Sequence, residues 1–137
     1  MNTAWAEATG KGWAIGNGRI RLDLEKGAAG GVTLASLRRP SAGGTSAFDW
    51  ALRGSPVGPM MQWEKTGALM GPEDAGFKLE ACIPHALPDE AAELVLSWRD
   101  DRRKALLTLR VTCFPGSAVL EWTARRFSRG PQHAHSR

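Results

Sequence analysis

The sequence has little of the material from which several classes of protein are built. No tyrosine and only two cysteines occur among its 137 residues. Cys82 and Cys113 are too few for a disulfide scaffold and lack the paired spacing of a zinc site, so we interpret them as small apolar side chains. No window approaches the roughly eighteen apolar residues of a membrane span, and residues 1–8 lack the basic start and apolar run of a signal peptide. These absences predict a soluble, cytoplasmic protein without a membrane partner.

Excess charge is confined to one end of the chain. The 18 Lys and Arg residues outnumber the 14 Asp and Glu residues by four. Arg125, Arg126, Arg129 and Arg137 lie in a stretch that contains no acid, so residues 1–124 carry 18 − 4 = 14 bases against 14 acids. A neutral body with a basic end predicts no nucleic-acid partner.

Catalytic and cofactor motifs are also missing. The chain has no nucleophile elbow, no P-loop and no dinucleotide fingerprint. His85, His133 and His135 have no acidic or cysteine partner at ligand spacing. We therefore expect neither a cofactor nor a metal.

Alternation of apolar and polar residues is what the sequence does contain, and it is typical of strands with one buried face. Ile20, Leu22 and Leu24 form the first such stripe. Four further stripes follow in the C-terminal half, made of Phe77, Leu79, Ala81 and Ile83; of Leu94, Leu96 and Trp98; of Leu107, Leu109, Val111 and Cys113; and of Leu120, Trp122 and Ala124. Both Trp98 and Trp122 are thereby predicted to lie in the core.

Turn residues separate these stripes at intervals of eight to twelve, and no ten-residue helical stripe occurs. The pattern predicts an all-β fold, an antiparallel β-sandwich of about eight or nine short strands over residues 1–126. Residues 88–96, the only helix-prone window, are better interpreted as a polar turn leading into a strand. Residues 127–137 show no alternation, and we expect a disordered C-terminal tail there.

Segment 113–125, with aromatic-Pro-Gly-Ser followed by Val-x-Glu-Trp, resembles the last hairpin of the N-terminal β-sandwich of α-galactosidase (melibiase) type glycoside hydrolases. Segments 12–17, 19–24, 34–39 and 94–100 fit the same domain, so the resemblance covers most of residues 12–125. In that family the catalytic carboxylates lie on a (β/α)8 barrel that follows the sandwich. The resemblance therefore implies an accessory domain that binds carbohydrate or a partner domain, and it carries over no catalytic residue. After Arg125 the chain departs from the family pattern, which suggests a truncated or out-of-frame end.

An aromatic platform with nearby carboxylates and amides is a common way to bind a pyranose. Trp50 and Trp63 lie in the irregular middle of the chain beside Asp49 and Gln62, and these four residues are the predicted sugar-binding set. Trp5 and Trp13 lie too near the N-terminus for an assignment. The alternative is that both indoles of the middle segment are core or docking residues.

Two rival functions remain open. A minimal stand-alone glycosidase would need two carboxylates across one bond, and Glu64, Glu80 and Glu121 are the candidates. A plain interaction module would need neither. We also expect a homo-oligomer, most simply a dimer, with Met60, Met61 or Trp63 at the interface, because segment 56–63 is apolar and rich in Met.

Overall fold

The computed structural model describes residues 3–27, 31–39, 48–49, 57, 61–62, 69–70, 77–101 and 104–128. Strands account for most of these residues. They are β1 (Trp5–Ala8), β2 (Gly12–Gly16), β3 (Arg21–Lys26), β4 (Val32–Arg39), β5 (Phe48–Asp49), β6 (Met61–Gln62), β7 (Leu69–Met70), β8 (Lys78–Ala86), β9 (Ala92–Asp100), β10 (Ala105–Cys113) and β11 (Leu120–Ser128). A single 3-10 turn, Pro88–Glu90, precedes β9, so window 88–96 is the polar turn and strand that the sequence predicts.

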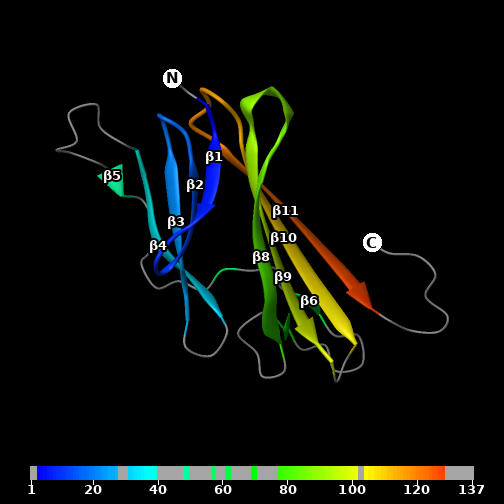
Figure 1. Ribbon diagram of the computed structural model, residues 1–137. Helices are drawn as coiled ribbons and strands as arrows, with labels where there is room; N and C mark the ends of the chain where they lie inside the picture. The colour runs from blue at the N-terminus through cyan, green and yellow to red at the C-terminus, as the bar shows by residue number, and fades with distance from the viewer. Residues whose placement is uncertain are drawn as a thin grey trace.

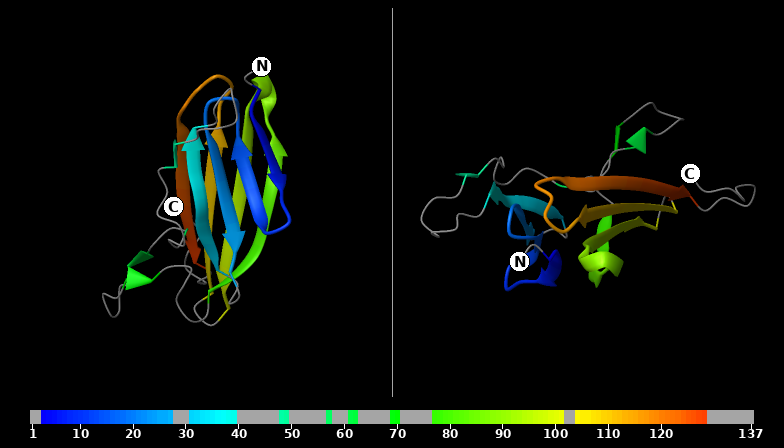
Figure 2. Two further views of the ribbon diagram at one scale, coloured as in Figure 1. Left: turned by 90° about the vertical axis from the view of Figure 1, so that its left-hand side faces the viewer. Right: turned by 90° about the horizontal axis from the view of Figure 1, so that it is seen from above.

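Two antiparallel sheets face each other (Figure 1). The first has the order β1-β2-β3-β4-β5 and the second β11-β10-β9-β8, while β6 and β7 pair only with each other. Strand β1 packs against β8 and β9, and β2 against β9. In the left view of Figure 2, β1 lies over β8 at one side of the molecule, and β4 lies beside β11 at the other side. The predicted all-β sandwich is confirmed, with eight strands of four or more residues.

Alternation along the strands builds the core between the sheets. The first sheet contributes Ile15, Leu22 and Leu24. The second contributes the stripes of β9 and β10, in which Trp98 is the largest side chain with no exposed surface. Each buried aliphatic or aromatic side chain of this kind stabilises the fold by about 1.5–3 kcal/mol through lost contact with water. Trp98 is therefore a core residue, as predicted.

Two β-bulges change which residues face the core. In β4 the extra residue is Ala35, because Leu34 pairs with Leu24 and Ser36 with Asp23. The bulge lets Leu34 and Leu37, three positions apart, point to the same side. In β8 the extra residue is Glu80, after which Ala81 pairs with Ser97 and Cys82 with Leu96.

The bulge in β8 overturns the prediction that Ala81 and Ile83 continue the inward stripe of Phe77 and Leu79. One added residue shifts the side-chain period by one and exchanges the two faces. Ile83 is consequently 48% exposed, whereas Cys82 packs against the core. Burial raises the pKa of Cys82 to about 12 and that of Cys113 to about 11.

Trp122 is the second correction. Its partner across the ladder is Val111, which is fully buried, so Trp122 stands on the core-facing side of β11 as its sequence parity predicts. It is nevertheless 43% exposed. The reason is position: β11 is the outermost strand of the second sheet, and in Figure 2 it lies beyond β4. The alternation in the sequence shows on which face of a strand a residue lies, but it does not show whether another sheet covers that face.

A buried asparagine ties the two sheets together at one end. Asn17 follows β2 and is 4% exposed. Its side-chain amide donates to the carbonyl oxygens of Phe114 (2.7 Å) and Ser117 (2.8 Å) in the turn between β10 and β11. The Asn17 Oδ1 atom accepts from the backbone N–H groups of Arg19 (2.7 Å) and Ile20 (3.0 Å). All the hydrogen-bonding groups of the amide are thus used, and the β2–β3 turn is fixed to the other sheet.

The last strand extends to Ser128, two residues past the predicted end of the sandwich at residue 126. Residues 129–137, the rest of the predicted tail, lie outside the described residues. Within the part of the chain that the structure describes, no helix has the length and hydrophobicity to cross a membrane.

Candidate ligand-binding site

Three of the seven site residues predicted from sequence lie outside the described part of the chain. Trp50, Trp63 and Glu64 fall there, as does Met60. Asp49 belongs to β5, where its backbone pairs with Arg38, and Gln62 belongs to β6, where its backbone pairs with Leu69. These two strands belong to different sheets, so strand pairing does not bring Asp49 and Gln62 together. The predicted sugar-binding set stays a prediction.

Glu80 and Glu121 lie at opposite edges of the second sheet. Glu80 is on β8 and Glu121 on β11, with β9 and β10 between them. Strands in a sheet are about 4.8 Å apart, so three strand spacings separate the two glutamates by at least about 14 Å. Paired carboxylates of glycosidases lie about 5–9.5 Å apart. Glu80 and Glu121 therefore do not form such a pair. Glu80 instead holds Arg99, whose Nη2 atom lies 3.2 Å from Glu80 Oε1, and this carboxylate raises the pKa of Arg99.

The outer face of the first sheet carries the most organised polar group among the described residues. Strand registers place Trp5, Gly16, Arg21 and Arg38 in one row across β1 to β4. Gly16 has no side chain, and a Cβ atom built there would lie 2.4 Å from the backbone oxygen of Ile20. Glycine is therefore needed where these two strands approach so closely. The Arg21 guanidinium carbon stands 5.1 Å from the centroid of the Trp5 ring. This is the geometry of a cation–π contact.

A second row begins with Glu7 on β1 and continues through Ala14 to Asp23 and Ser36. Arg21 and Asp23 lie two positions apart on β3, so both side chains project from the same face. Arg21 Nε donates to both oxygens of Asp23 (3.2 and 3.1 Å), and Nη2 lies 3.0 Å from Asp23 Oδ1. The Ser36 hydroxyl donates to Asp23 Oδ2 at 2.9 Å.

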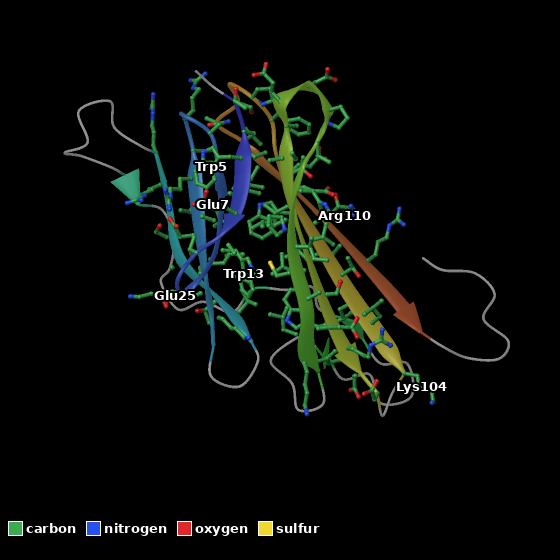
Figure 3. All side chains as sticks on the ribbon, in the orientation of Figure 1. Trp5, Glu7, Trp13, Glu25, Lys104 and Arg110 are labelled. Carbon is green, nitrogen blue, oxygen red and sulfur yellow. The ribbon has the colours of Figure 1, made fainter. Side chains whose placement is uncertain are left out.

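This network holds the charged groups in place. The Asp23 hydrogen bond raises the pKa of Arg21, with the nearby charges of Asp23 and Glu7 adding to the effect. The side chains of Arg21 and Asp23 are 31% and 22% exposed, so each keeps a surface open to solvent. Figure 3 shows Trp5, Glu7 and Glu25 on the side of the first sheet that faces away from the second, whereas Trp13 points between the sheets.

A hollow of about 390 Å³ lies beside the network. Lys11, Arg21 and Arg38 provide positive charge around it, and Asp23 and Glu25 provide negative charge. Other lining residues are Thr9, Gly10, Leu24, Ala35 and Ser36. A larger hollow of about 710 Å³ adjoins the same β1–β2 turn and shares Thr9, Gly10, Lys11 and Glu25 with the first. The two hollows adjoin around that turn and share these four residues.

Both hydrogen-bond donors and acceptors line the smaller hollow. Guanidinium and ammonium groups only donate, carboxylates only accept, and the Thr9 and Ser36 hydroxyls do both. Three basic and two acidic side chains line the smaller hollow, so its net charge is close to neutral. Within the described ranges no cluster of three or more His, Cys, Asp or Glu side chains could hold a metal ion. The arrangement suits a small, hydroxyl-rich ligand better than an ion.

Sequence reasoning did not single out this site. The alternation in run 19–25 predicts only that its polar residues face solvent. It predicts no role for Trp5. An Arg and an Asp two positions apart in an alternating run do signal an ion pair on one strand face. Nothing in the sequence signals that Trp5 and Ser36, from β1 and β4, join them, because that depends on the strand order.

None of three comparisons, with protein-family models, with curated proteins and with solved structures, finds a match to this chain. The resemblance to the sandwich of α-galactosidase type enzymes stays an expectation, and the function has to be argued from the site.

Proposed function

We propose that the chain is a carbohydrate-binding β-sandwich whose sugar site is the hollow beside Arg21, Asp23 and Ser36. The observation that carries the proposal is the fixed Arg21–Asp23–Ser36 network on the wall of a hollow of about 390 Å³. A sugar hydroxyl donates one hydrogen bond and accepts others. It can therefore bridge a carboxylate and a guanidinium that already lie side by side, as Asp23 and Arg21 do.

Preorganisation supports the same proposal. Ordering a long side chain on binding costs about 0.5–1.5 kcal/mol. Arg21 is held by Asp23 and rests over Trp5 before binding, so most of that cost is met in folding. The Trp5 ring is not part of the lining of the hollow, but it contacts Arg21, which is, and so helps to hold that guanidinium in place.

Charge distinguishes this ligand class from others. A phosphate or nucleotide site needs a clear excess of positive charge. Here Asp23 and Glu25 offset two of the three basic side chains. A neutral saccharide needs no such excess.

Calorimetric titration with galactose- and glucose-containing oligosaccharides tests the proposal. The wild-type protein is expected to bind at least one of them. In Asp23→Asn the carboxylate that holds Arg21 and Ser36 is lost, and we expect the Kd to rise at least about tenfold, corresponding to about 1.4 kcal/mol. Asp101→Asn is the matched control, because it removes an exposed carboxylate from the turn after β9, in the other sheet. It should leave the Kd unchanged.

Two outcomes contradict the proposal. One is the absence of binding to every oligosaccharide, which would favour the plain interaction module. The other is equal affinity in Asp23→Asn and wild type, which would move the site elsewhere. Release of nitrophenol from nitrophenyl glycosides would instead support the glycosidase alternative, with carboxylates other than the pair Glu80 and Glu121.

A further inference from the structure

The outer edge of β11 differs from every other sheet edge among the described strands. The edges of the first sheet are short: β1 has four residues and β5 has two. The remaining edge of the second sheet, β8, contains Pro84 and the bulge at Glu80. Proline and bulges protect an edge from pairing with another strand.

Strand β11 has neither protection. All nine residues from Leu120 to Ser128 pair with β10 in unbroken register, and none is proline. The strand borders the sheet in both views of Figure 2. No strand among the described residues pairs with its other side, whose row of backbone donors and acceptors is long enough to add a further strand.

Side chains of β11 are exposed on both faces. Residues 121–125 are all exposed, including the core-facing Trp122. In the part of the chain that the structure describes, neither Glu121 nor Arg125 makes an ion pair, although their neighbours on the same sheet do so: Arg110 with Glu93 at 3.0 Å, and Arg99 with Glu80. Among the described side chains of this strand, Glu121 and Arg125 thus carry opposite charges without an ion-pair partner, and Trp122 is large, apolar and partly exposed.

We infer that two copies of this chain dimerise by pairing their β11 strands antiparallel about a twofold axis at Thr123. In this register Glu121 of one copy lies opposite Arg125 of the other, and the symmetry makes the pair twice. Trp122 lies opposite Ala124, a large side chain beside a small one, also twice. The two four-stranded sheets join into one sheet of eight strands.

The charges of Glu121 and Arg125 favour this strand register over the registers shifted by two or four residues. Sliding the strands by two residues in either direction places Thr123 opposite Glu121 or Arg125 and loses both ion pairs. Sliding by four places Glu121 opposite Glu121 or Arg125 opposite Arg125. Like charges directly opposite are destabilising, and opposite charges are stabilising. A strand that matches itself under twofold symmetry gives a closed dimer rather than a fibre. A second copy is thus the occupant that this edge fits.

The inference is independent of the sugar site, which lies on the other sheet. It rests on residues of β11 rather than on Met60, Met61 and Trp63, the residues named from sequence. Strands β6 and β7 pair with neither sheet, and the side chains of that segment lie outside the described residues.

Light scattering after size exclusion at micromolar concentration, on the full chain, provides the first test. We expect a mass of two chains for wild type. Glu121→Arg and Arg125→Glu each place like charges opposite one another twice, and each should weaken the dimer at least about tenfold. The double variant Glu121→Arg/Arg125→Glu restores opposite charges and should restore the dimer. Lys78→Glu, a charge reversal on the exposed start of β8, is the matched control and should stay dimeric.

Cysteine cross-linking tests the register itself. In the proposed dimer Thr123 faces its own copy, at the spacing of about 4.5–5.5 Å of an antiparallel pair, which suits a disulfide. Thr123→Cys should form a covalent dimer on mild oxidation. Glu121→Cys should not, because the two copies of residue 121 are four positions apart along the strands, about 13 Å.

Either of two results overturns the inference. The first is a mass of one chain at every concentration. The second is a dimer that survives both single charge reversals and does not cross-link through Thr123→Cys. A dimer lost in Met61→Asp but kept in Glu121→Arg would belong to this second case and would assign the interface to the β6 segment.

Discussion

Asn17 offers the sharpest perturbation of the sandwich, because one side chain links a turn of each sheet. Asn17→Ala removes two hydrogen bonds to carbonyl oxygens of the opposite sheet, each worth about 1 kcal/mol net. It also removes the acceptor of the buried Ile20 N–H group, and an unsatisfied buried donor costs about 1–3 kcal/mol. The free energy of unfolding should fall by about 3–5 kcal/mol.

Asn17→Asp keeps the hydrogen-bond acceptor of this side chain and removes its donor. The carboxylate still accepts from Arg19 and Ile20, but it places negative charge against the carbonyl oxygens of Phe114 and Ser117. Burial and these oxygens raise the pKa of the new carboxyl in the folded state above its unfolded value of about 3.9. At neutral pH the ionised carboxylate therefore lowers the free energy of unfolding of Asn17→Asp relative to wild type. This loss of stability should shrink as the pH falls through the folded-state pKa, because the group then binds a proton.

Urea unfolding followed by tryptophan fluorescence, at pH 7 and pH 4.5, measures both variants. Arg19→Ala is the control, because it removes only the exposed hydrogen bond from Arg19 Nη1 to the Gly116 oxygen, and it should cost below about 0.5 kcal/mol. A loss below about 0.5 kcal/mol in Asn17→Ala would refute the reasoning. So would a deficit in Asn17→Asp that does not depend on pH.

Three further outcomes follow from burial and composition. Trp98→Ala should lower the free energy of unfolding by about 3–5 kcal/mol, whereas Trp122→Ala, measured at concentrations where the chain is monomeric, should cost about 1 kcal/mol; equal losses would contradict the exposure of Trp122. Because burial raises the pKa of Cys82 to about 12 and that of Cys113 to about 11, both thiols should react with a disulfide reagent at pH 8 at least about tenfold more slowly than in urea, and the rate should still be rising at pH 10; a plateau below pH 9 would show an ordinary thiol. The far-ultraviolet circular dichroism spectrum should be that of a β protein with less than about a tenth helix; paired minima at 208 and 222 nm, the helical spectrum, would exclude the sandwich.

The all-β sandwich could be predicted from sequence because its evidence is local. Alternation in β3, β9 and β10 specifies which residues face inward, and Leu22, Leu96 and Val111 are buried as that pattern requires. Turn residues such as Asn17 mark where strands reverse. These signals are carried by residues that are close in the chain.

Features set by the arrangement of strands could not be predicted in this way. The bulge at Glu80 turns Ile83 outward, although the alternation through this segment is uninterrupted in sequence. Trp122 has core parity but occupies an edge strand. The candidate site combines Trp5, Arg21 and Ser36 from three strands, and only the pairing order shows that they are neighbours. Trp50 and Trp63, chosen for their chemistry, remain a prediction.

The indole N–H signals of the six tryptophans provide the most direct measurement of the proposed sugar site. In an ¹⁵N-correlated spectrum, titration with the oligosaccharide that binds most tightly should shift the Trp5 signal, assigned from its loss in Trp5→Phe. The Trp98 signal should not move, because that ring has no exposed surface and lies between the sheets. Saturable shifts of Trp5, abolished in Asp23→Asn, are the result that the account predicts. A Trp5 signal that stays fixed while calorimetry records binding would place the sugar on another surface and contradict the assignment of the hollow.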